Sequence, residues 1–294
     1  MEMATLGKTG LKVSRLGAGL FEIGTLSDVS AASQLLNAAL DGGINFLDTA
    51  ACYDNSEEWI GRTISHRRTE YVLATKSGHV TGGYEGNEWT AQTILDSIER
   101  SLDRMKTDYV DLVQLHSCGV DILERGEAIQ ALIDAKRVGK TRFIGYSGDR
   151  EAALWAVESG QFDTLQTTFN LLGQEAHMEL FAKAEARGMG IIAKRPIANA
   201  AWCAPAGSEP VDWYRQRMQA MLDMGPIPGA PQNLIALALG FTLAHPEVDT
   251  AIVGTCNLEH LQSNIKSVKG ELPIPAEVVQ ELHRRFERLE PSQG

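Results

Sequence analysis

Strand-like and helix-like segments alternate along almost the whole chain, and this alternation limits the possible folds more than any other feature. Short, mostly apolar runs predict strands at Val13–Ala18, Ile44–Asp48, Tyr71–Thr75, Tyr109–Leu115, Arg142–Tyr146, Thr164–Thr168, Met189–Ala193 and Asp249–Val253. Apolar residues at helical spacing predict helices after them, at Val29–Leu40, Glu57–Ser65, Thr90–Met105, Asp121–Val138, Arg150–Ser159, Gln174–Arg187, Pro231–Ala244 and Leu258–Val268. Strands this apolar suit a parallel sheet covered by helices. The pattern predicts an α/β fold, a (β/α)8 TIM barrel.

Both ends of the chain add to this barrel. A turn at Lys8–Gly10 predicts an N-terminal β-hairpin that caps one end, and Ala276–Leu289 is predicted to be an extra C-terminal helix. No linker or shift in composition divides the chain, so we expect residues 1–294 to form a single domain. A doubly wound sheet is the competing fold, but its glycine fingerprint is missing because Gly24 follows Gly17 and Gly19 too late.

The charge balance argues against several classes of partner. Lys and Arg number 27 against 38 Asp and Glu, which gives a net charge of −11. We therefore expect no binding to nucleic acid or to an anionic membrane surface. No apolar run is long enough to span a bilayer, and the N-terminal residues lack the apolar block of a secretory signal, so we expect a cytoplasmic protein. The four cysteines are far apart, and we expect reduced thiols.

Reactive side chains stand at or just after three consecutive predicted strands. Asp48 ends the second strand and Tyr53 follows it, Lys76 ends the third strand, and His116 ends the fourth. Each residue has an ordinary structural role open to it, such as capping a helix or anchoring a loop. In a barrel, however, the carboxyl ends of the strands meet on one rim, where active sites are built. We therefore expect all four side chains to converge there.

These four residue types suit proton transfer to a carbonyl oxygen. A free tyrosine is a weak acid, and an adjacent lysine cation lowers the pKa of its phenol. Asp48 is expected to hold Lys76 by an ion pair, and a neutral His116 to orient the carbonyl or share the proton of Tyr53. Because a carbonyl that gains a proton on oxygen needs a hydride on carbon, the set also implies a nicotinamide cofactor.

The motifs that carry these residues resemble the aldo-keto reductase family from residue 5 to about residue 267. They are GGINFLDTAACYDNSEEWIGR, LATKSG, DRMKTDYVDLVQLH and RFIGYSG. The resemblance implies a (β/α)8 barrel that binds NADPH, with NADH possible, and a catalytic tetrad of Asp48, Tyr53, Lys76 and His116 in which Tyr53 is the proton donor. It also implies that the cofactor is bound by Gly19, Leu20, Asp48, Ser147, Gln166, Lys194, Arg195, Pro196, Ile197, Gly254, Thr255, Asn257, His260 and Asn264.

Three positions depart from the family pattern. Ser147 is followed by Gly148 where the family often has asparagine. Lys194 and the three residues after it stand where many members have a tyrosine that stacks on the nicotinamide. Gly254 and His260 stand where a 2′-phosphate clamp commonly has lysine or arginine. The preference for NADPH therefore rests on the family alone.

The substrate pocket is expected to be aromatic and apolar, with Phe21, Trp89 and Trp202 in its wall. The long segment 197–229 is either a lid over this pocket or a partly helical insertion packed on the rim. The seven histidines are scattered without metal-ligand spacing, so we expect no metal.

The sequence predicts an NAD(P)H-dependent oxidoreductase that reduces a small-molecule aldehyde or ketone reversibly, as a monomer or weak homo-oligomer. Two alternatives stay open besides the reverse direction, in which the enzyme is an alcohol or sugar dehydrogenase. One is a cofactor-sensing regulatory subunit of the same fold, which a long N-terminal extension would favour. We expect no such extension, because the barrel begins near Met1. The other is a Schiff-base lyase using Lys76, which an adjacent Asp48 disfavours.

Overall fold

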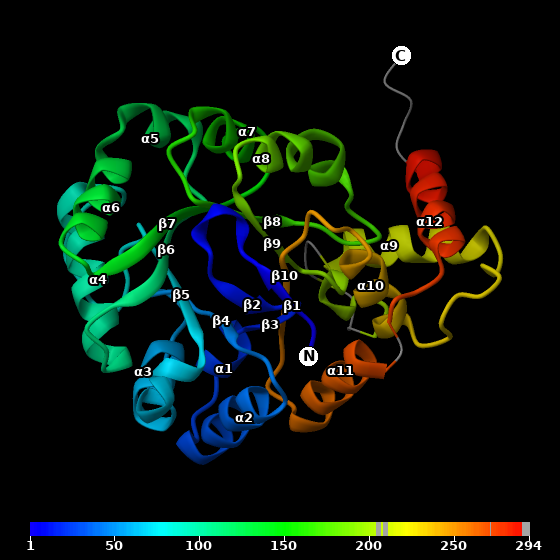
Figure 1. Cartoon of the computed structure of the whole chain (residues 1–294), viewed down its shortest axis with the longest axis horizontal. Helices are drawn as coiled ribbons and strands as arrows, with labels where there is room; N and C mark the ends of the chain where they lie inside the picture. The colour runs from blue at the N-terminus through cyan, green and yellow to red at the C-terminus, as the bar shows by residue number, and fades with distance from the viewer. Residues whose placement is uncertain (204–206, 208–210, 271, 290–294) are drawn as a thin grey trace.

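Eight parallel strands close into a barrel, as the alternating pattern predicts. The computed structural model of the chain describes residues 1–203, 207, 211–270 and 272–289. The barrel strands are β3 (Leu16–Gly19), β4 (Phe46–Asp48), β5 (Val72–Ser77), β6 (Val110–His116), β7 (Thr141–Ser147), β8 (Thr164–Thr168), β9 (Gly190–Lys194) and β10 (Thr250–Gly254). They pair in chain order, and β10 closes the ring against β3 (Figure 1).

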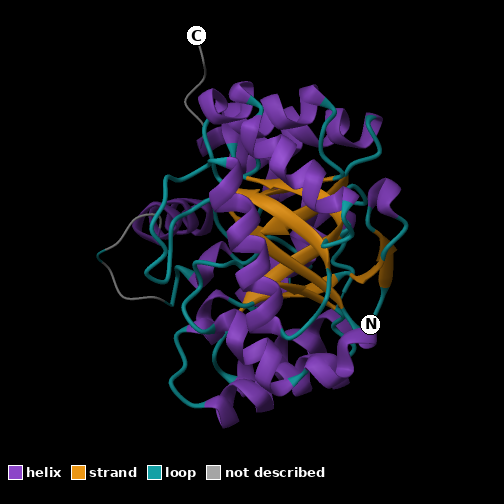
Figure 2. Ribbon diagram, turned by 90° about the vertical axis from the view of Figure 1, so that its left-hand side faces the viewer, coloured by secondary structure: helices purple, strands orange, loops and turns teal. Residues whose placement is uncertain are grey.

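Helices surround this barrel on the outside (Figure 2). They are α1 (Phe21–Gly24), α2 (Val29–Asp41), α3 (Ser56–Thr63), α4 (Ala91–Met105), α5 (Val120–Arg125), α6 (Glu127–Arg137), α7 (Arg150–Ser159), α8 (Ala182–Ala186), α9 (Val211–Asp223), α10 (Leu234–Leu243), α11 (Leu258–Gly270) and α12 (Ala276–Leu289). Short 3-10 segments are η1 (Gly7–Thr9), η2 (Ser65–Glu70) and η4 (Ala198–Ala200), while η3 (His177–Phe181) is a π-helix. Within the described residues, no helix is long and apolar enough to cross a membrane.

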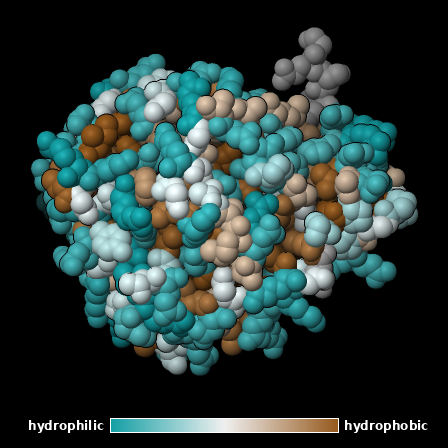
Figure 3. All heavy atoms as spheres, viewed as in Figure 1, coloured by the Kyte–Doolittle hydropathy of each residue, from teal (hydrophilic) through white to brown (hydrophobic). Residues whose placement is uncertain are grey.

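The predicted N-terminal hairpin lies across one end of the barrel (Figure 1). Its strands β1 (Met3–Thr5) and β2 (Lys12–Ser14) pair antiparallel. Leu6 and Leu11 belong to the same buried cluster as the barrel side chains Phe46, Leu112 and Ile192, so the hairpin closes an apolar barrel interior. On this face the surface is mostly hydrophilic, with hydrophobic residues interspersed (Figure 3).

The structure divides some elements that the sequence pattern merges. The predicted strand Val13–Ala18 is broken between β2 and β3, because the Ser14 hydroxyl donates to the Leu16 carbonyl at 2.6 Å and turns the chain. The predicted helix Asp121–Val138 is broken at Gly126, which has a φ of +73° and ends α5. Such a backbone favours glycine and ends helices.

The segment 197–229 is the partly helical insertion that was one of the two predicted alternatives. It contains η4 and α9, and residues 204–206 and 208–210 lie outside the described part of the chain. Tyr214 and Met218 of α9 are buried, which fixes this helix against the rest of the fold. Asn199 and Ala200 have φ values of +55° and +48°, a costly backbone for residues with a side chain.

Candidate active site

The four predicted reactive side chains meet at the carboxyl ends of neighbouring strands. Asp48 is the last residue of β4, Lys76 lies near the end of β5, and His116 is the last residue of β6. Tyr53 stands on the turn after β4, whose backbone is held because the Tyr53 N–H donates to the carbonyl of Ala50 at 3.0 Å. Consecutive parallel strands thus bring together residues that are well separated in the sequence.

A buried ion pair forms the floor of this site. The Nζ of Lys76 lies 2.6 Å from Oδ2 of Asp48 and also donates to the Thr49 carbonyl at 2.9 Å. The second oxygen of Asp48 accepts from the amides of Gln114 and Gln166, at 3.1 and 2.8 Å. Burial by itself lowers the pKa of Lys76, but the charges and hydrogen bonds of Asp48 and Tyr53 together outweigh it and the pKa is raised. Lys76 is therefore held as a cation.

Tyr53 stands directly above this pair. The Nζ of Lys76 is 4.8 Å from the centroid of the tyrosine ring, which Phe21 and His116 flank edge-on at 5.1 and 5.7 Å between centroids. Burial raises the pKa of Tyr53, while the Lys76 cation acts to lower it. The sequence predicts a lowered pKa, but the net pKa of Tyr53 is raised. Removing the phenolate from water disfavours ionisation by more than the Lys76 cation favours it. The raised pKa favours the protonated phenol of Tyr53.

His116 is the neutral imidazole of the site. Burial lowers its pKa to about 3, and Lys76, His79 and Lys194 add to the shift. Its Nδ1 lies 3.4 Å from Sγ of Cys52, a residue that the sequence argument missed. Burial raises the pKa of Cys52, which keeps it a thiol. When the thiol donates to Nδ1, the Nε2 of His116 carries the proton and can donate to an oxygen in the cavity.

A cavity of about 810 Å³ opens over these residues. It is lined by most of the predicted cofactor and site residues, namely Gly19, Leu20, Phe21, Asp48, Tyr53, His116, Ser147, Gln166, Lys194, Arg195, Pro196, Ile197, Gly254, Thr255, His260 and Asn264. Lys76 lies beneath this surface, wholly buried. The volume falls in the range of small-molecule and cofactor sites.

Besides Lys76, three predicted residues lie outside the cavity lining. Trp89 packs on His79, 4.8 Å between ring centroids, and His79 in turn contacts His116, so the indole is one ring removed from the site. Trp202 packs against the hydrophobic core instead. Asn257 faces α11, where its side chain accepts from the backbone N–H groups of Glu259 and His260, at 2.8 and 3.3 Å. These amides are therefore already paired within the protein.

One wall of the cavity is built by a second ion pair. The Nζ of Lys194 lies 3.1 Å from Oδ2 of Asp149, whose other oxygen accepts from the N–H of Thr168 at 2.7 Å. Burial lowers the pKa of Lys194, and Asp149 opposes that shift. Beside it, the Ser147 hydroxyl donates to the side-chain oxygen of Gln166 at 2.8 Å. Lys194 is thus aimed by Asp149, which the sequence argument did not single out.

Sequence reasoning missed several other residues of the site. Gln114 lies within β6 and is fully buried, and a polar residue inside an apolar strand was the available signal. The carboxylate of Glu22 packs against Gly254, so close that a Cβ there would meet its oxygen. The remaining cavity-lining residues, none of them predicted as site residues, are Ser117, Asn199, Ala200, Cys203, Asn233, Ile235, Ile252, Val253 and Ser263. Most come from the insertion and from loops, whose course the pattern does not predict.

A closed parallel barrel with a phenol, an imidazole and a buried ion pair at the strand ends has the architecture of a barrel enzyme. The chain belongs to the aldo/keto reductase family, whose model matches residues 15–284. It is 28% identical to L-galactose dehydrogenase of Arabidopsis thaliana, over 91% of this chain and 88% of that protein. It is also 28% identical to the uncharacterized oxidoreductase YqkF of Bacillus subtilis, over 92% of each.

A solved structure supports the same assignment. The holo form of the aldo-keto reductase AKR11C1 from Bacillus halodurans matches with a TM-score of 0.83 and 26% identity, over 100% of this chain and 99% of that one. The protein is therefore an oxidoreductase with the barrel fold of this family.

Proposed function

We propose that the protein reduces an aldehyde or ketone to an alcohol, with a proton from Tyr53 and a hydride from NADPH or NADH. One observation carries the proposal: the protonated phenol of Tyr53 faces the cavity from above the buried pair of Lys76 and Asp48. General acid catalysis requires a proton donor held within reach of the reacting oxygen. The reverse reaction, oxidation of an alcohol or sugar, uses the same residues.

The residues of the cavity suit a nicotinamide cofactor. Gly254 and Gly19 pair on adjacent strands and both line the cavity, where the Glu22 carboxylate packs against Gly254. Ser147 and Gln166 offer donors and acceptors to the carboxamide, and Lys194 and Arg195 offer positive charge to phosphate. A nicotinamide bound along this wall supplies the hydride.

The protein's own groups complete the proton transfer. His116, neutral and facing the same cavity, donates from its Nε2 to the carbonyl oxygen and orients it toward Tyr53. The phenol of Tyr53 gives its proton to that oxygen as negative charge develops there. The Lys76 cation, fixed by Asp48, then stabilises the phenolate that is left. A Schiff base at Lys76 is disfavoured, because Asp48 keeps this amine charged and buried.

The proposal is tested by following the absorbance of reduced nicotinamide with a panel of aromatic and aliphatic aldehydes. NADPH and NADH are supplied in parallel, and reactions without aldehyde give the background. We expect aldehyde-dependent oxidation of at least one cofactor. Binding of either cofactor without any aldehyde-dependent oxidation would contradict the proposal and favour the cofactor-sensing role.

A further inference from the structure

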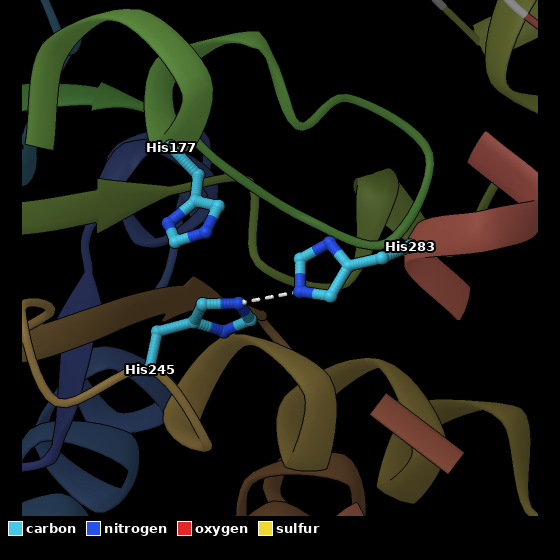
Figure 4. Close-up of side chains that lie close together, drawn as sticks. All are labelled: His177, His245 and His283. Carbon is cyan, nitrogen blue, oxygen red and sulfur yellow. Dashed lines mark hydrogen bonds between the residues drawn. The ribbon is translucent and has the colours of Figure 1, made fainter. Parts of the chain in front are cut away.

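Three histidines that are far apart in the sequence meet outside the active site. His177 begins the π-helix η3, His245 follows α10, and His283 lies on α12. One ring nitrogen of each lies within 4.8 Å of the others, and all three rings point into the same space (Figure 4). None of them lines the active-site cavity. They are the only group of this kind among the described residues, and they sit against the rings of Phe169 and Phe241.

The hydrogen bonds around two of these rings fix their tautomers. Nδ1 of His245 lies 2.8 Å from the carbonyl of Phe241, which only accepts, so this nitrogen carries a proton. Nδ1 of His283 lies 2.6 Å from Oε1 of Gln174. The amide of Gln174 is oriented by its own donation to the carbonyls of Leu171 and Leu282, so its oxygen faces the histidine and accepts. Nδ1 of His283 therefore carries a proton as well.

It follows that the two nitrogens facing each other are both acceptors. Nε2 of His245 and Nε2 of His283 are 3.1 Å apart, and in neutral rings each presents a lone pair to the other. A shared proton or a bound cation relieves this repulsion. A proton, however, serves only two nitrogens, and a ring nitrogen of the third histidine, His177, lies within 4.8 Å of a ring nitrogen of each of the other two. A cation with three ligands accounts for the whole cluster.

We propose that His177, His245 and His283 bind a divalent transition-metal cation of the zinc class. Two nitrogens bound to one zinc ion at about 2.0–2.1 Å are about 3.3 Å apart in a tetrahedral site, close to the spacing of the two Nε2 atoms. Phe241 and Gln174 already act as the outer acceptors that hold metal-ligating imidazoles in the required tautomer. Three imidazoles leave a fourth position for water.

The surroundings of the cluster agree with this assignment. His245 is buried, and His177 and His283 are half-buried. The carboxylates of Glu247 and Glu287 act on these rings from nearby and offset part of the positive charge. A bound cation would tie α12 to η3 and to the end of α10.

The site is tested by titrating the chelator-treated full chain with Co²⁺, whose visible absorption reports its coordination, and by displacing it with Zn²⁺. We expect one tetrahedral cobalt per chain. Three variants each remove one proposed ligand: His177→Gln, His245→Gln and His283→Gln. Removing a residue that only hydrogen-bonds a metal ligand lowers metal affinity about 10- to 100-fold, and we expect each of these variants to lose more than that. The matched control is His66→Gln, which removes an exposed histidine outside the cluster.

Thermal unfolding provides a second measurement in case replacing one of these histidines prevents the variant from folding. Without metal, circular dichroism identifies the variants that fold, and His177→Gln and His283→Gln should be milder than His245→Gln because those two side chains are only half-buried. Zn²⁺ should raise the Tm of the wild type and of His66→Gln but not that of His177→Gln. Absence of cobalt binding in the wild type, or binding that survives in all three cluster variants, would overturn the proposal. Neither result depends on reductase activity.

Discussion

The Nζ of Lys76 lies 2.6 Å from Oδ2 of Asp48, and the two side chains are 1% and 2% exposed. Two ions so fully removed from water persist only when each neutralises the other and its remaining hydrogen bonds are made. The Thr49 carbonyl, Gln114 and Gln166 make them here. The ion pair therefore stabilises the barrel rim and also fixes the positive charge of Lys76 next to Tyr53.

Removing the negative partner should destabilise the fold strongly. Asp48→Asn leaves the Lys76 cation buried without its counter-ion, a change that costs about 3–5 kcal/mol. Chemical unfolding followed by circular dichroism measures this loss. Asp121→Asn, which breaks an exposed pair with Arg125, is the matched control and should cost less than about 1 kcal/mol. Equal losses in the two variants would contradict the role of burial.

The lowered pKa of His116 should appear as a pH dependence of stability. The folded pKa is about 3, whereas the ordinary value is 6.5. Between these values the unfolded chain binds more protons than the folded one, so stability is complete above pH 6.5 and falls as the pH drops toward 3. Between pH 7 and pH 4, the free energy of unfolding should fall less for His116→Gln than for the wild type, as measured by urea unfolding at each pH. An identical loss would exclude His116 as a contributor.

Loss of Lys194 should weaken cofactor binding more than turnover. Its ammonium pairs with Asp149, and the residue lines the cavity. We expect Lys194→Met to raise the Kd of NADPH about tenfold, a loss of about 1.4 kcal/mol, and to change kcat much less. Lys183→Met, which removes a surface lysine paired with Glu158, should leave both unchanged. A fall in kcat at unchanged Kd would place Lys194 in the chemistry instead.

Changing His260 should alter the choice between the two cofactors. The residues of α11 that line the cavity are His260, Ser263 and Asn264, so this helix presents no arginine or lysine there to clamp a 2′-phosphate. Arginine binds phosphate through a bidentate fork, so His260→Arg is expected to raise the ratio of kcat/KM for NADPH over NADH about tenfold. His66→Arg adds the same charge at a remote exposed position and controls for net charge. A ratio that does not move would indicate that the adenosine end binds elsewhere.

The barrel could be predicted because its strands and helices follow local hydrophobic patterns. Asp48, Lys76 and His116 could be predicted for the same reason, since each ends a strand and parallel strands end on one rim. Gln114, Cys52 and the histidine cluster could not, because their roles arise from contacts across strands and helices that no spacing encodes. The raised pKa of Tyr53 was missed because burial, unlike neighbouring charge, is not visible in the sequence.

The central claim is that Tyr53 is the proton donor of a carbonyl reductase. Its most direct test compares Tyr53→Phe with Tyr84→Phe, which removes a hydroxyl that hydrogen-bonds Asp96 outside the cavity. Cofactor affinity is measured by fluorescence titration, and turnover by the loss of reduced nicotinamide with an aldehyde substrate. The account predicts that Tyr53→Phe loses at least about 100-fold in kcat, the lower range for a general acid, while its cofactor Kd and the activity of Tyr84→Phe stay near wild type. Turnover by Tyr53→Phe within tenfold of the wild type would contradict it.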